Sequence, residues 1–277
     1  MEYEFSLNDT SVQEYVIRVH VLNSQPQKNF PILIVIKQQQ QVLSFEVPVV
    51  VNEVIKHANV SRTLCPIRVD PDDAAKLTIG ISSFAPEPIT YMVRAEWVRD
   101  FDLNLSETRG LQIYPAQPML LRYRFTQSSD SVAVRIVSPD DVCMTFSLQP
   151  IQCPWDPGMR FGREQGPYQT VTSLGVISIN VMSIKLQYEE GFFVLLTLEP
   201  TDYLCKGIEK LIPIPVGQYR RIEPNNRTKS VRITLQPTPN RKSKRCMYVL
   251  LIHELCFSIS FAEFFRPYFN LQIMKIC

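Results

Sequence analysis

Basic side chains that could bind an anion gather in one segment, residues 206–245 of the 277-residue chain. The segment holds eleven Lys and Arg residues against two Glu residues, a net charge of +9. Because the whole chain carries +2 and residues 246–277 are balanced, the first 205 residues carry −7. A cationic segment joined to an acidic body predicts an anionic partner, and phosphate groups attract such side chains in a salt-dependent way. The candidate contact residues are Tyr219, Arg220, Arg221, Arg227, Lys229 and Arg232.

The end of this segment has a second interpretation. Residues 241–245, with four basic side chains, directly precede the apolar run 246–265, as basic residues do beside a membrane. The run has about the length of a spanning helix, but His253 and Glu254 lie near its middle, where ionisable groups are costly. A poor transmembrane helix, a buried helix and non-native sequence all stay open for this tail.

Catalytic chemistry has no support in the sequence. There is no GxSxG motif, no HExxH motif and no Gly-rich phosphate loop. The histidines His20, His57 and His253 are far apart in sequence. The spacing of Cys246, His253 and Cys256 matches no standard metal site. We therefore expect a protein that is not an enzyme and that needs no metal or cofactor.

Cysteines and glycosylation sequons favour an oxidising compartment. None of the seven cysteines forms a CxxC pair, and the first four fit either two disulfides or four buried thiols. These four are Cys65, Cys143, Cys153 and Cys205. Glycosylation sequons begin at Asn8, Asn59, Asn104 and Asn226. The N-terminus has no basic stretch followed by an apolar one, so no signal peptide is recognised.

The elements that would position these residues are short β-strands. Period-two alternation is clear in "YVIRVHV", "SVAVRIVS" and "SVRITLQP". Further strands are expected near 30–37, 42–50, 76–83, 89–99, 119–126, 143–149, 168–180 and 192–199. Their spacing predicts an all-β chain of two tandem antiparallel β-sandwiches with an apolar C-terminal tail. Prolines in "LQIYPAQPMLLRYRF" suggest a linker, so we predict domains over 1–113 and 114–240 and a tail over 241–277.

Two local predictions concern the first domain. The stretch "PILIVIKQQQQVLSFEVP" indicates a hairpin whose first strand is apolar on both faces, as in the centre of a sheet, with a solvated connection over 37–41. The stretch "DPDDAAKL", residues 70–77, is the best candidate for a short helix because acidic residues lie at its start. The predicted buried residues are Ile32, Ile34, Ile36, Phe45 and Val47 in the first domain and Tyr123, Val132, Val134 and Ile136 in the second.

Several stretches together carry a family resemblance. They are "PILIVIKQQQQVLSFEVP", "SRTLCP", "AQPMLLRYRF", "DSVAVRIVS", "IQCP" and "GPYQTVT", in this order. This set resembles the N-terminal extracellular region of the systemic RNA interference-defective (SID) transmembrane family, over about residues 15–235. After about residue 240 the sequence no longer resembles the family's first membrane helix.

The resemblance implies two jelly-roll-like β-sandwiches on the cell surface or in the lysosomal lumen, N-glycosylated and assembled as a homodimer. It implies the disulfides Cys65–Cys153 and Cys143–Cys205. The function it implies is a non-catalytic, nucleic-acid-binding region of a SID-type double-stranded RNA transporter, joined to a membrane domain in the full-length family architecture. The alternative is a structural or adhesive ectodomain that mediates dimerisation or binds a protein or glycan.

Overall fold

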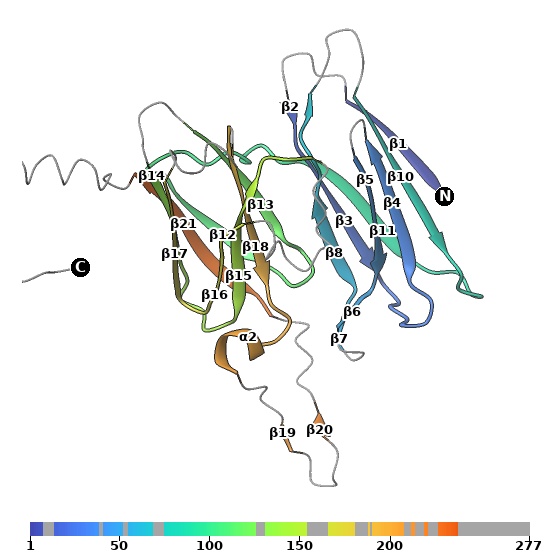
Figure 1. The fold of residues 1–277 in the computed structure, drawn as a ribbon. Coiled ribbons are helices and arrows are strands. Elements are labelled where there is room, and N and C mark those ends of the chain that lie inside the picture. The colour runs from blue at the N-terminus through green and yellow to red at the C-terminus, as the bar shows by residue number, and fades with distance from the viewer. Residues whose placement is uncertain are drawn as a thin grey trace, which may run out of the picture. The chain divides into compact units, whose positions relative to one another are not determined.

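The described part of the chain folds almost entirely into antiparallel β-strands (Figure 1). The computed structural model describes residues 1–7, 14–38, 41–51, 55–68, 75–125, 131–153, 166–180, 188, 190–207, 212–213, 219–220 and 227–237. Within these ranges the one helix is the single turn α2 (Tyr203–Lys206). No helix in the same ranges combines the length and the apolar character that crossing a membrane requires. The prediction of an all-β fold is confirmed.

Two antiparallel sheets enclose the first core. One has the strand order β1-β10-β4-β5 and the other the order β11-β3-β8. Their bounds are β1 (Glu2–Leu7), β3 (Ile17–Asn23), β4 (Ile32–Gln38), β5 (Gln41–Val47), β8 (Asn59–Thr63), β10 (Ala75–Ser83) and β11 (Tyr91–Trp97). Alternate apolar side chains of both sheets point inward and form one cluster. Of the predicted core residues, Ile32, Ile34, Ile36 and Val47 are buried, whereas Phe45 is half-buried beneath the Arg62 guanidinium.

The glutamine-rich hairpin differs from its prediction in two ways. Strand β4 is central in its sheet, but its outward side chain Leu33 is 36% exposed, so only one face is buried. Gln41 is not a solvated loop residue, because it is 4% exposed and its Oε1 accepts the backbone N–H of Cys65 at 2.9 Å. Gln38 Nε2 donates to the Cys65 carbonyl oxygen at 3.0 Å. The side-chain amides of Gln38 and Gln41 therefore bind the backbone of Cys65, which lies far away in sequence. The interpretation of this stretch as a solvated loop did not predict that role.

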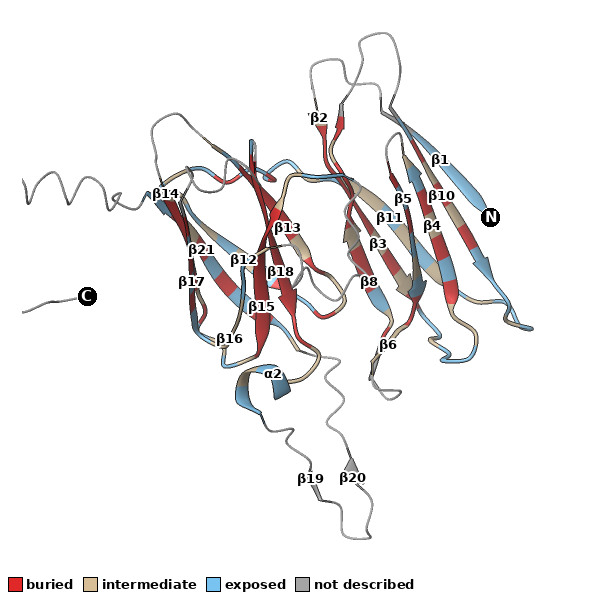
Figure 2. Cartoon of the chain, in the orientation of Figure 1, coloured by how far each residue is buried: buried red, intermediate tan, exposed pale blue. Residues whose placement is uncertain are grey.

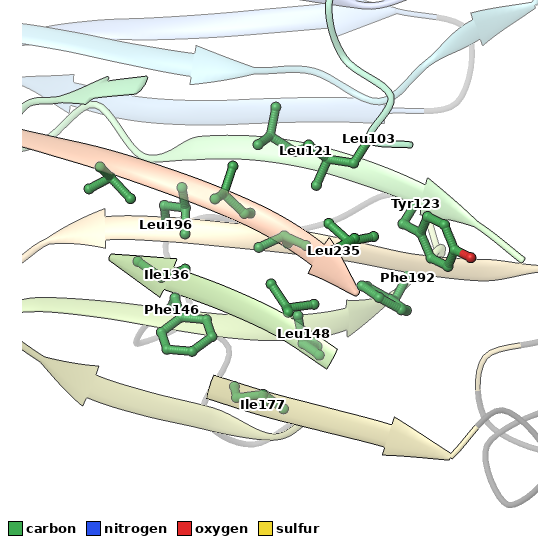
Figure 3. Packing of buried hydrophobic residues seen from close by; sticks show 14 of the residues in the cluster. Leu103, Leu121, Tyr123, Ile136, Phe146, Leu148, Ile177, Phe192, Leu196 and Leu235 are labelled. Carbon is green, nitrogen blue, oxygen red and sulfur yellow. The ribbon is translucent and has the colours of Figure 1, made fainter. Parts of the chain in front are cut away.

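The second core lies between two more sheets, ordered β12-β21-β14-β17 and β13-β18-β15-β16. Their bounds are β12 (Thr108–Ile113), β13 (Met119–Arg124), β14 (Ser131–Val137), β15 (Met144–Pro150), β16 (Tyr168–Val171), β17 (Leu174–Asn180), β18 (Gly191–Leu198) and β21 (Lys229–Pro237). Figure 3 shows side chains of both sheets meeting, among them Ile136, Phe146, Leu196 and Leu235. The predicted core residues Tyr123, Val132, Val134 and Ile136 are all buried.

The outer faces of these two sheets differ. Strands β15 and β18 are buried along nearly their whole length, on both faces (Figure 2). Strand β21 instead alternates between buried and exposed residues over most of its length. The β12-β21-β14-β17 sheet therefore offers an open outer face, and the β13-β18-β15-β16 sheet does not.

Covalent and polar contacts join the two sandwiches within one compact unit, Met1–Pro237. The disulfide Cys65–Cys153 links the segment after β8 to the segment after β15, with a Cα–Cα distance of 6.1 Å. A second disulfide joins Cys143 to Cys205, at 5.6 Å. These are the two pairs that the family resemblance implies. Arg18 Nη1 donates to the Pro118 carbonyl oxygen at 2.8 Å, and burial lowers the pKa of Arg18 to about 10.

An ion-pair network adds to this connection. Arg122 Nη2 lies 2.6 Å from Glu14 Oε2, and Arg122 Nε lies 2.6 Å from Asp102 Oδ1. Burial alone would lower the pKa of Arg122, but hydrogen bonds to Asp102 and Glu14 raise it overall. Because Glu14 lies in β2 (Glu14–Tyr15), this network connects the start of the chain to β13.

Some predicted boundaries differ from the structure. Residues 75–77 begin β10, so the helix expected over 70–77 is wrong there, and 70–74 lie outside the described residues. The division into domains at 113 and 114 stays a prediction. Strand β12 precedes that boundary but pairs with β21, which argues for a boundary before Thr108. The tail from 241 lies outside the described residues.

The remaining short strands are paired as β2 with β9 (Ile67–Arg68), β6 (Val49–Val51) with β7 (Ile55–His57), and β19 (Ile212–Pro213) with β20 (Tyr219–Arg220).

Candidate nucleic-acid interface

The predicted basic segment is only partly within the described residues. Tyr219 and Arg220 form β20, which pairs with β19, and only their backbone is described. Arg221 and the basic residues after 237 lie outside the described part of the chain. The described candidates are therefore Arg227, Lys229 and Arg232, and these three have different surroundings.

Arg227 is held by an internal carboxylate. Its Nη2 donates to Asp202 Oδ1 at 2.5 Å, and the same oxygen accepts the backbone N–H of Cys143 at 2.9 Å. Burial alone would raise the pKa of Asp202, but the hydrogen bonds from Arg227 and Cys143 lower it overall. Lys206 Nζ, 3.7 Å from Asp202 Oδ2, completes the network. The charge of Arg227 is thus balanced inside the protein beside the Cys143–Cys205 disulfide.

Lys229 faces the interior. The residue is 0% exposed, and its Nζ donates to the carbonyl oxygens of Asp140 and Thr172, each at 2.5 Å. Burial lowers the pKa of Lys229. The ammonium group therefore fastens the loop after β14 and the turn between β16 and β17 to the first residue of β21. It presents no charge to an external phosphate.

Arg232 faces outward from the middle of β21. It is exposed, as are its same-face neighbours Ser230 and Gln236, and it forms no ion pair with any residue that the structure describes. Arg135 is exposed on the adjacent strand β14, where it lies opposite Thr234. Arg135 was not among the predicted contact residues, although in "SVAVRIVS" it alternates with the buried Val134 and Ile136. Two exposed arginines therefore occupy neighbouring strands of one open sheet face.

The sequons fall on both described and undescribed residues. Asn59 is exposed at the start of β8. Asn104 is also exposed, and its Nδ2 donates to Glu107 Oε2 at 2.9 Å. Asn8 and Asn226 lie outside the described residues. Glycosylation at the four sites stays a prediction.

The described ranges contain no candidate metal site. Among those residues, no three His, Cys, Asp or Glu side chains come together in a way that could hold a metal ion. Residues Cys246, His253 and Cys256 lie outside those ranges.

Comparison with known proteins decides the family. The model of the family described as the dsRNA-gated channel SID-1 matches residues 116–273, more than half of the chain. The chain belongs to the SID-1 family. The match reaches residue 273, beyond the end near residue 235 that the sequence analysis gave to the resemblance.

Individual relatives agree with this assignment. SID1 transmembrane family member 1 of Mus musculus is 30% identical to this SID-1 family chain over 216 residues, and that of Rattus norvegicus is 31% identical over 216 residues. Cholesterol uptake protein 1 of Caenorhabditis elegans is 29% identical over 201 residues. Each match covers 73% of this chain and 25% of the relative. The chain thus spans about a quarter of the length of these relatives.

Proposed function

We propose that this chain is the extracellular or lumenal, nucleic-acid-binding region of a SID-type double-stranded RNA channel. The matching family is described as a dsRNA-gated channel, which supports RNA as the partner. The two disulfides and the exposed sequon residues Asn59 and Asn104 support an oxidising, extracellular or lumenal setting. In this proposal the chain binds RNA and is not itself an enzyme.

The observation that carries this proposal is the exposure of Arg232, which has no ion-pair partner among the residues that the structure describes. Arg227 and Lys229 satisfy acceptors of the protein itself, whereas Arg232 is available to an external anion. Double-stranded RNA has a deep, narrow major groove that side chains cannot read, so contacts to phosphate and the 2′-hydroxyl group are expected. Binding should therefore be insensitive to sequence and strongly sensitive to salt.

A titration of the purified 277-residue chain with fluorescent duplex RNA of mixed sequence tests this function. We expect fluorescence anisotropy to rise saturably, with log Kobs falling linearly as log salt concentration rises. Two duplexes of equal length and different sequence should bind within about twofold of each other. Failure to bind duplex RNA at any salt concentration would remove the function and favour the adhesive alternative.

We also propose a homodimer, supported by the position of β11 at the edge of its sheet, where no further strand of the described residues pairs with it. This strand is the last in its sheet, and an unpaired edge is a template for pairing with another chain. Antiparallel pairing of two β11 strands about Ala95 would place Arg94 of one copy opposite Glu96 of the other, twice by symmetry. Sedimentation of the wild-type chain should show a dimer that weakens in Arg94→Glu; a monomer at all concentrations contradicts it.

A further inference from the structure

The outer face of the β12-β21-β14-β17 sheet carries an ordered array of side chains. Strand pairing aligns Thr108, Thr234, Arg135 and Val176 in one row across the four strands. The next row, two residues along, contains Gly110, Arg232, Val137 and Leu174. Arg135 and Arg232 are thus diagonal neighbours on adjacent strands, a relation that places such residues about 7–8 Å apart, with their Cβ atoms somewhat closer.

This face is cationic, and the described residues of its four strands include no outward carboxylate. At one end of the face, Asp140 Oδ2, from the loop after β14, accepts the backbone N–H of Ser230 at 2.6 Å. Besides the two arginines it carries hydroxyl, amide, small and aliphatic side chains. These are Thr108, Gly110, Gln112, Ser131, Ala133, Val137, Leu174, Val176, Ser178, Ser230, Thr234 and Gln236. Ser230 Oγ donates to Gln112 Oε1 at 3.0 Å, and the hydroxyls of Thr108 and Thr234 lie 2.9 Å apart. Side chains of these types commonly contact phosphate and sugar oxygens.

The outer faces of the other three sheets are less suited to an anion. The face of β1-β10-β4-β5 includes Glu2, Glu4 and Glu46, all exposed. The face of β11-β3-β8 includes Glu96, which lies 2.8 Å from both His20 Nε2 and Arg94 Nη2. The face of β13-β18-β15-β16 is largely buried. Within the described residues, the β21 face therefore matches a polyanion best.

We propose that the phosphate backbone of duplex RNA docks on this face, with Arg135 and Arg232 as its charged contacts; this inference rests on the proposed function. The face has no aromatic side chain among its described residues, and proteins that bind single strands use aromatic rings to stack the bases. A flat array of arginines and hydroxyl groups instead fits a backbone whose bases are paired. The face thus predicts a preference for duplex over single-stranded RNA.

Gly110 offers a substitution that tests charge separately from shape. It lies opposite Arg232 on the edge strand β12, and a Cβ added there meets no atom within 4 Å. Gly110→Glu introduces a carboxylate beside Arg232, whereas Gly110→Gln introduces an amide of nearly the same size. We expect the Glu variant to bind duplex RNA at least about tenfold more weakly than the Gln variant. The reason is that the new carboxylate neutralises the charge of Arg232 and so weakens its contact with a phosphate group.

Removal of the arginines provides the second arm. In Arg135→Gln/Arg232→Gln, the magnitude of the slope of log Kobs against log salt should fall by about two, one for each lost phosphate contact. The matched control is Lys37→Gln/Lys76→Gln, which removes two positive charges from exposed sites on the first sandwich. The control should retain the wild-type slope. Thermal unfolding of every variant within about 2 °C of wild type establishes that folding is intact.

The outcomes separate the two proposals. If the wild-type chain does not bind duplex RNA, the proposed function fails and this inference fails with it. If wild type binds but the double arginine variant keeps its affinity and slope, the function stands and the docking face is overturned. Equal losses of RNA affinity in Gly110→Glu and Gly110→Gln would also overturn the docking face, because the loss would then not depend on charge at position 110. Equal changes of the salt slope in the arginine and lysine double variants would overturn it too, because the change would then not depend on charge at this face.

Discussion

Replacing Lys229 with methionine should affect stability and leave RNA binding unchanged. Methionine keeps the length and packing of the lysine stem but cannot donate to the carbonyl oxygens of Asp140 and Thr172. An acceptor that loses its partner costs about 1–3 kcal/mol when it is fully buried. Both residues are only half-buried, so water can recover part of the loss, and the variant no longer buries a charge. We therefore expect a net loss of about 1–2 kcal/mol, or a decrease in Tm of about 2–8 °C.

The assay compares Lys229→Met with Arg232→Gln in two measurements, thermal unfolding and duplex RNA anisotropy. Arg232 is exposed, so its replacement should change stability by less than about 0.5 kcal/mol while weakening RNA binding. Lys229→Met should show the opposite behaviour. A Lys229→Met variant that melts like wild type but binds RNA more weakly would refute the assignment of Lys229 as an internal clamp.

The pH dependence of stability gives an independent check of the same residue. Burial lowers the pKa of Lys229 below its ordinary value of 10.5. Between the lowered and the ordinary pKa, the unfolded chain binds more protons than the folded chain, so wild-type stability gains a contribution that increases with pH. Below the lowered pKa both states are protonated and the contribution is flat. The Lys229→Met variant should lack this alkaline rise when unfolding is measured by denaturant titration.

Three further predictions concern stability. Asp202→Asn should cost about 1–3 kcal/mol near neutral pH through the weakened contact with Arg227. Because the pKa of Asp202 is lowered, denaturant titrations at pH 7 and at successively lower pH should show this difference shrinking as the pH falls below the ordinary carboxyl pKa and through the lowered one. Ile34→Ala, at a fully buried core site, should cost about 2–5 kcal/mol by the same titration. Joint replacement of Cys65 and Cys153 by serine should cost about 4–5 kcal/mol, since their bond closes a long loop with a sequence separation of 88; an unchanged Tm would contradict it.

Most of the strands could be predicted because their alternation is strong. Over 132–136 in β14 and 231–235 in β21 every second residue is Val, Ile or Leu, and these residues are buried. Strand β12, Thr108–Ile113, escapes the period-two pattern because its inward positions are Arg109, Leu111 and Ile113 and a glycine interrupts it. Only pairing with β21, more than a hundred residues later, reveals it as a strand.

The candidate site could be predicted less completely, because charge counting identifies ions but not their partners. The carboxylate that holds Arg227 is 25 residues away in sequence, and the carbonyl oxygens that hold Lys229 are 57 and 89 residues away. Arg135 lies outside the basic segment altogether and joins Arg232 only through the pairing of β14 with β21. The partners of Arg227 and Lys229 and the position of Arg135 beside Arg232 all depend on how distant segments come together in the fold, which local sequence does not specify.

The geometry of a strand explains how one basic segment can serve two purposes. Successive side chains of a strand point to opposite faces, so residues of the same parity share a face. Arg227 and Lys229 precede the inward series Val231, Ile233 and Leu235 at the same parity, and both satisfy acceptors of the protein. Arg232 has the opposite parity and is exposed on the outer face. A count of +9 therefore overstates the charge available to an external anion, and the available charge on β21 lies where it can be changed without disturbing the core.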